Sequence, residues 1–293
     1  MVMVWVLVVM ELYPFGCEAA SFFDKGGKLK QVELAVTAAS SGGSVVAALG
    51  KDVAVAVCWA PAQEEPSEHI RISPRCRVLC DSVGYCSTGV GADATHLCNR
   101  LFDAVANHDD VYGSTPVIGR LAKDLASYVH ESTLSVRHRP FGVRSLILGR
   151  DPAPSGAGAG AGAGVWTGTG AQQPALFEVD PLGNCHSCKL ACLGPHGAQL
   201  MEAWPANLNP STLEAGRLVV EAVEVLRAVL EKEGASLRDP AQQARLEVLV
   251  GGPGVRGTGV LPASCLHTLL QQHDGGSGGG GAAAAMTEAL RDL

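Results

Sequence analysis

Residues 44–58 read SVVAALGKDVAVAVC and carry the first clear structural pattern in the chain. Two runs of small and β-branched apolar residues, Ser44–Leu49 and Val53–Cys58, are separated by Gly50-Lys51-Asp52. Valine favours strands, and a Gly-containing polar tripeptide between two such runs is typical of a turn. The segment therefore predicts a strand, a turn and a second strand.

The chain beyond this segment alternates between strand and helix patterns. Val78–Thr88 predicts one or two strands, and apolar residues at helical spacing predict helices that begin at Asp93 and Pro116. Further strands are expected at Phe141–Leu148, Leu176–Val179, Cys185–Leu193 and Leu246–Val250. Ser211 is expected to cap a long helix, and Pro262–Gln271 to form a short last one. Two successive helices between blocks of strands favour layered α+β packing over βαβ units.

Composition limits the classes of function. The 293 residues carry a net charge of −7, with 17% charged and 47% hydrophobic residues. Such a chain is too apolar for global disorder, and an acidic chain without a long basic run is a poor candidate for binding nucleic acid. The apolar run at residues 1–10 is too short to span a membrane. A cleaved secretory signal is the weaker alternative for this run, because no basic residue precedes it.

Much of the glycine lies in two segments, and this distribution suggests the domain boundaries. Of the 36 glycines, many fall in 152–172 (PAPSGAGAGAGAGVWTGTGAQ) and 275–285 (GGSGGGGAAAA), which have linker compositions. We expect an apolar extension at 1–20, one domain at 21–272 with a loop insert at 152–172, and a Gly/Ala-rich tail at 273–293.

Several short motifs, in order along the chain, resemble those of proteasome α-type subunits. They are GKLKQVELA at 27–35, GVGAD at 89–93, RPFGV at 139–143 and DPLG at 180–183, followed by Lys189 and Gly194. The RPFGV string and the GKL start resemble the α2 type most. Departures include Leu34 in place of the family's tyrosine and the lack of proline in the turn at 24–27.

The resemblance implies a fold, a function and partners. The fold would be an α+β four-layer α/β/β/α sandwich of the Ntn-hydrolase type. The chain would be a non-catalytic subunit of the α ring of the 20S core particle, in the cytoplasm and nucleus, and would take part in ring assembly, gating and activator docking during ubiquitin-dependent protein degradation. Its partners would be other α subunits, β subunits and the C-termini of activators or the regulatory particle, with no nucleic acid, membrane, metal or cofactor.

The resemblance also implies two sets of site residues. Arg75 and Gly89 would help to form an intersubunit pocket for an activator's C-terminal carboxylate, where arginine would replace the family's lysine. An ordinary surface arginine is the alternative. A helix at Lys28–Ser40 would contact the ring neighbour, through Lys28, Leu29, Gln31, Val32, Glu33, Ala35 and Val36. Val32, Ala35, Val36 and Ala39 form an apolar stripe at helical spacing.

A threonine hydrolase of the related β type is the first alternative function. Such an enzyme needs an N-terminal threonine at the first strand, a carboxylate and a lysine. Alignment of the strand–turn–strand segment places glycine at the nucleophile position, Gly42, and cysteine at the carboxylate position, Cys58. No threonine lies between Thr37 and Thr88, and no lysine between Lys51 and Lys123, so we expect no catalytic residue.

A cysteine-rich metal- or redox-binding protein is the second alternative. Cys185, Cys188, Cys192 and His196 are spaced like a zinc cluster. On one continuous strand, however, Cys188 and Cys192 would lie about 13 Å apart, and Cys185 would point to the opposite face from Cys188. We therefore expect buried free thiols and no metal at this cluster.

Overall fold

Two antiparallel sheets form the centre of the molecule. The computed structural model describes residues 23, 26–60, 74–135, 138–152, 172–234, 246–252 and 257–261. The first sheet has the order β10 (Gly259–Val260), β9 (Leu246–Gly251), β2 (Ala54–Trp59), β1 (Ser44–Leu49) and β8 (Leu190–Leu193). The second has the order β3 (Cys76–Cys80), β4 (Val83–Gly89), β5 (Val143–Pro152), β6 (Gln172–Val179) and β7 (Cys185–Ser187). Every adjacent pair of strands is antiparallel.

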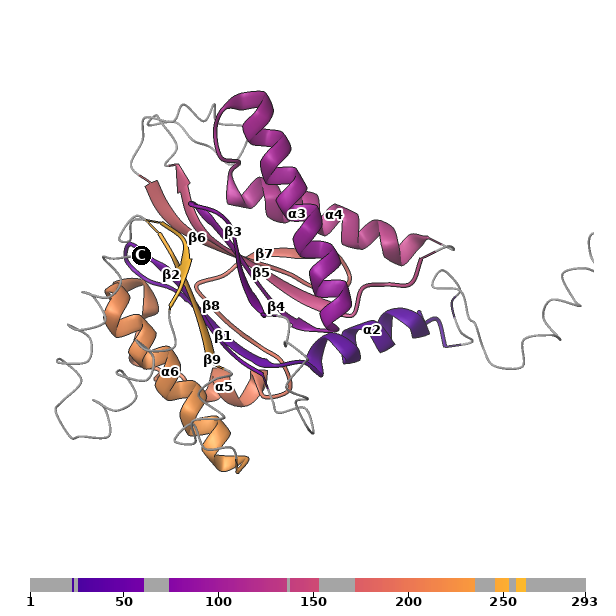
Figure 1. Ribbon diagram of the computed structural model, residues 1–293. Coiled ribbons are helices and arrows are strands. Elements are labelled where there is room, and N and C mark those ends of the chain that lie inside the picture. Colours follow the sequence, from indigo (N-terminus) through magenta and orange to yellow (C-terminus); the bar gives the residue numbers. More distant parts are fainter. Residues whose placement is uncertain are drawn as a thin grey trace, which may run out of the picture.

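Helices cover the outer face of each sheet (Figure 1). The helices α3 (Gly91–Tyr112) and α4 (Ile118–Leu134) pack on the second sheet, whereas α5 (Gly197–Ala203) and α6 (Ala215–Lys232) pack on the first. The helix α2 (Lys30–Ser40) precedes β1 and contacts β4 and β5. The layers are α/β/β/α, which confirms the expected α+β sandwich.

The valine- and alanine-rich strands are apolar on both faces because both faces are buried. In β1, Val45 and Ala47 face the space between the sheets, whereas Val46 and Ala48 belong to the core under α6. Much of the core between the sheets is built from small side chains, including Ala47, Ala54 and Ala56. A strand buried on both faces loses the polar–apolar alternation of a half-exposed strand, which explains the continuous apolar runs at residues 44–58.

The predicted hairpin around the Gly/Ala-rich insert agrees with the strand pairing. Strands β5 and β6 pair from Ser145↔Val179 to Pro152↔Gln172. Residues 153–171 of the insert, the extension at 1–20 and the tail at 273–293 lie outside the described residues, as does the helix expected at Pro262–Gln271. Within the described part of the chain, no helix has the length and apolarity that a membrane span requires.

Two expected elements differ in the structure. The single strand predicted at Cys185–Leu193 is divided, because the chain crosses from one sheet to the other: the Cys188 N–H donates to the Leu176 carbonyl, and the next carbonyl, of Lys189, accepts from Leu49 of the first sheet. Ser211 does not cap the long helix. It lies in a 3-10 turn at Pro210–Thr212, where the Asn209 side chain accepts from the Ser211 N–H, and α6 begins only at Ala215.

Candidate functional site

The helix α2 has an inner and an outer face. Val32, Ala35 and Ala39 are buried. The apolar stripe predicted for ring contact is therefore mostly occupied by packing within this chain. Val36 is the exception, with 38% of its surface exposed at the margin of the buried stripe, and Leu34 is 56% exposed. Because residues two apart on a helix do not face each other, Leu34 and Val36 lie on different sides of α2, and Leu34 is the apolar side chain that points away from the core.

The other predicted contact residues surround this outer face. Lys28 and Glu33 are exposed and form an ion pair of 3.1 Å. Leu29 and Gln31 are half-buried at the start of the helix. An exposed ion pair contributes little to stability, because water screens it and two long side chains must be ordered. The ion pair of Lys28 and Glu33 therefore adds little to the stability of this fold.

Arg75 and Gly89, predicted together for an activator pocket, are in direct contact. Arg75 Nη1 donates to the carbonyl oxygen of Gly89 at 2.9 Å, across the edge of β3 and β4. Gly89 has a φ of +109°, and a Cβ there would lie 2.2 Å from the Gly142 carbonyl oxygen. The position thus requires glycine both for its backbone conformation and for its packing.

Sequence reasoning missed Glu247, which holds the backbone around Arg75. One oxygen of its carboxylate, Oε2, accepts from the backbone N–H groups of Arg75 at 2.9 Å and Cys76 at 2.8 Å. Burial raises the pKa of Glu247, while these two N–H groups act in the opposite direction. The sequence offered one sign of this role: a glutamate lies inside the otherwise apolar strand 246–250, and a carboxylate buried in such a strand needs hydrogen-bond partners.

Two of the motifs that carried the resemblance meet at Asp93. Arg139 donates from Nη1 to Oδ2 and from Nη2 to Oδ1 of Asp93, both at 2.7 Å. The Gly142 N–H also donates to Asp93 Oδ2, at 3.0 Å, and the Val90 N–H donates to the Gly142 carbonyl at 2.9 Å. The GVGAD and RPFGV segments thus form one joint, which ties the start of α3 to the start of β5 next to α2.

The nucleophile position of the β-type alternative is sterically closed. A Cβ at Gly42 would lie 2.2 Å from the Gly89 backbone nitrogen and 2.8 Å from Thr88 Oγ1. The nearby hydroxyl of Thr88 is buried and donates to the Gly43 carbonyl at 2.7 Å. A threonine at residue 42 would therefore require the surrounding backbone to move.

The cysteines that converge are not those that the sequence spacing suggested. Among the described residues, the group with closely placed ligand atoms consists of Cys58, Cys76 and Cys86, which come from three strands. Cys185, Cys188 and Cys192 do not join a group of this kind; Cys185 and Cys192 lie on strands of different sheets. No sequence spacing could reveal the converging group, because strand pairing and sheet packing create it.

Comparison with known proteins agrees with this architecture. Residues 39–156 match the family described as proteasome subunit. Proteasome subunit alpha type-1 of Dictyostelium discoideum is 32% identical over 129 residues, which are 44% of this chain and 51% of that protein. Probable proteasome subunit alpha type-2 of Schizosaccharomyces pombe is 25% identical over 215 residues, 72% of this chain and 78% of that protein. Proteasome subunit alpha type-2 of D. discoideum is 26% identical, over 59% of this chain and 65% of that protein.

In its four-layer fold and over the matched residues 39–156, the chain is similar to proteasome subunits. Within the family, the relatives named above are alpha-type subunits. At identities between 25% and 32%, the chain is a divergent relative of these alpha-type subunits. The match spans about half the length of the first of these relatives, with 51% of that protein covered.

Proposed function

We propose that this chain is a structural, non-catalytic subunit of the proteasome α ring, which contributes to ring assembly, gating and activator docking. The observation that carries the proposal is α2: a helix ahead of the first strand that packs on the core through Val32, Ala35 and Ala39 and leaves Leu34 exposed on its outer side. Burial of such an apolar side chain favours association with another protein surface. Neighbouring α and β subunits are the proposed partners.

Single substitutions on the outer face of α2 test this proposal. Leu34→Asp places a charge in the proposed interface, and burial of an unpaired charge disfavours association. We expect it to reduce incorporation of the chain into proteasome particles at least tenfold, measured by quantitative mass spectrometry of affinity-purified particles. Leu134→Asp is the matched control, because Leu134 is 62% exposed at the end of α4. Equal incorporation of the two variants would contradict a contact through α2.

The absence of peptidase activity is also part of the proposal. The closed position at Gly42 and the cysteine at position 58 support it. We expect the purified chain to hydrolyse no fluorogenic peptide, and Gly42→Thr to create no activity because the side chain has no space. Hydrolysis by the isolated chain, retained after separation from every β subunit, would contradict a non-catalytic role.

We further propose that Arg75 and Gly89 belong to a pocket for an activator's C-terminal carboxylate. The hydrogen bond from Arg75 to Gly89 places the guanidinium at one backbone carbonyl, and a guanidinium carries five N–H donors. In particles that contain the chain, we expect Arg75→Ala to weaken binding of an activator C-terminal peptide about tenfold, the loss of one charge-assisted hydrogen bond. The amidated peptide should bind the native and variant particles equally; an equal loss for both peptides would contradict carboxylate recognition.

Location in the cytoplasm and nucleus follows as a proposal from this role. Cell fractionation with antibody detection tests it, and recovery of the chain from secretory compartments alone would contradict it.

A further inference from the structure

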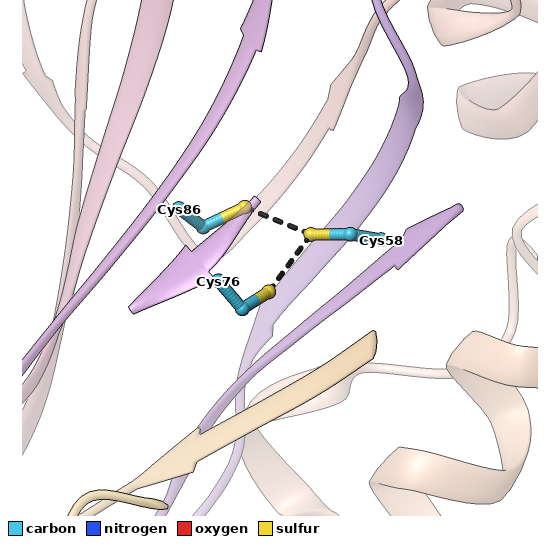
Figure 2. Close-up of side chains that lie close together, drawn as sticks. All are labelled: Cys58, Cys76 and Cys86. Atoms are coloured by element: carbon cyan, nitrogen blue, oxygen red, sulfur yellow. Dashed lines mark hydrogen bonds between the residues drawn. The ribbon is translucent and has the colours of Figure 1, made fainter. Parts of the chain in front are cut away.

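Three cysteines from both sheets meet in the core of the molecule (Figure 2). Cys58 lies on β2 of the first sheet. Cys76 on β3 and Cys86 on β4 are direct partners in the register of the second sheet. Cys58 therefore faces a pair of thiols across the space between the sheets.

The three sulfur atoms lie at contact distance in a dry environment. Cys58 Sγ is 3.1 Å from Cys76 Sγ and 2.9 Å from Cys86 Sγ. Their exposed fractions are 1%, 3% and 0%, and the surrounding core is formed by aliphatic side chains such as Ala56 and Leu146. In the described part of the chain, no histidine or carboxylate joins this group within the separation that a shared metal ion allows.

The surroundings of the cluster shift the pKa values of the three thiols in different directions. Hydrogen bonds from Cys58 and Cys76 lower the pKa of Cys86 although burial raises it, and the Arg75 guanidinium acts in the same direction as these bonds. Burial raises the pKa of Cys58, whereas hydrogen bonds with Cys58 and Cys86 raise that of Cys76. Of the three thiols, Cys86 alone thus has its pKa lowered, with a positive side chain close by.

We propose that Cys58, Cys76 and Cys86 form a binding site for a soft monovalent d10 metal ion, Cu(I), that joins the two sheets. Thiolate sulfur is the ligand type that Cu(I) prefers. Structural zinc, by contrast, almost always takes four ligands, and the described residues bring together only three in a space closed to water. The site depends on this chain alone and not on the proposed role in the α ring.

The positions of the three sulfur atoms permit the binding of one Cu⁺ ion. A metal bound to three sulfurs at about 2.3 Å separates them by about 4.0 Å, so the two short distances must increase by about 1 Å through small side-chain rotations. Each thiol that becomes a ligand of Cu⁺ is converted to a thiolate, and its proton is released to solvent. Copper enters and remains as Cu(I), so that no atom is oxidised or reduced.

Anaerobic titration of the full-length chain with Cu(I), against a chromophoric chelator that competes for the ion, tests the site. We expect one tightly bound Cu(I) per chain. Because removal of even an outer-shell group weakens metal sites by about 10–100-fold, Cys58→Ser should weaken binding by about 100-fold or more. Cys98→Ser and Cys192→Ser are matched controls, since they remove a buried thiol of α3 and a half-buried thiol of β8, and both should leave the affinity within twofold.

X-ray absorption at the copper edge of the native chain gives a second readout that does not depend on the folding of a variant. The expected first shell contains sulfur alone. Nitrogen or oxygen neighbours, unchanged affinity in Cys58→Ser, or no stoichiometric binding by the native chain would each overturn the proposal. Tight binding of Zn(II) with displacement of Cu(I) by equimolar Zn(II) would also overturn it.

Discussion

The joint at Asp93 supports a quantitative prediction about stability. Asp93→Ala removes the acceptor of two Arg139 hydrogen bonds and of the Gly142 N–H. The side chain of Arg139 is 61% exposed, so loss of its ion pair should cost only about 1 kcal/mol. Gly142 is buried, and leaving its N–H without a partner should cost about 1–3 kcal/mol. We therefore expect Asp93→Ala to lower the free energy of unfolding by about 2–4 kcal/mol.

A double-mutant cycle separates this joint from a general surface effect. Arg139→Ala leaves the Asp93 carboxylate with the Gly142 N–H and the positive end of α3, so it should cost about 1–2 kcal/mol. Once Asp93 is gone, removal of Arg139 should cost little more, and the double variant should resemble Asp93→Ala. Urea unfolding followed by the fluorescence of the buried Trp59 and Trp204 measures all four free energies. Additive effects, within about 0.5 kcal/mol, would refute the reasoning.

Other predictions concern Gly89 and Glu247. Gly89→Ala should lower the free energy of unfolding by about 3 kcal/mol or more, because of its positive φ and the contact with the Gly142 carbonyl. Gly113→Ala, at a positive φ but with open space around it, should cost only about 1 kcal/mol in the same urea assay, and equal losses would contradict the steric argument. Burial raises the pKa of Glu247, so the folded state favours the protonated form of this side chain. The stability that this preference provides is fully present below about pH 4.3 and is lost as the pH rises through the raised pKa. The stability of the native chain minus that of Glu247→Gln should therefore fall in urea titrations as the pH rises from about 4.3 through the raised pKa, and a rise with pH would reverse the sign that we assign.

Most of the regular elements could be predicted from local patterns. The strands around Gly50-Lys51-Asp52, the helices α3 and α4 and the hairpin of β5 and β6 follow from apolar periodicity and turn residues. The predicted strand at residues 185–193 failed because sequence alone does not indicate where a chain changes sheets. The expected cap at Ser211 failed because Ser211 lies inside a 3-10 turn that Asn209 caps, and α6 begins only at Ala215.

The sequence also predicted the candidate sites only in part. Arg75 and Gly89 were paired by the resemblance, and the structure brings them into contact; their role in activator binding stays a prediction. Glu247 and the converging cysteines were missed, because their partners are distant in sequence and depend on how the two sheets face each other. The burial of Val32 and Ala35 of α2 within this chain was also not evident from the sequence, since an apolar stripe does not indicate which surface covers it.

The most direct test of the ring-subunit proposal is the native mass of the particle that contains the chain. Affinity purification of the full-length chain from its own cells, followed by native mass spectrometry, should yield an assembly in which α and β proteasome subunits accompany it. Release of the subunits in the gas phase should show one copy of the chain in each α ring. Recovery of the chain only as a free monomer or a self-oligomer would contradict the proposed function.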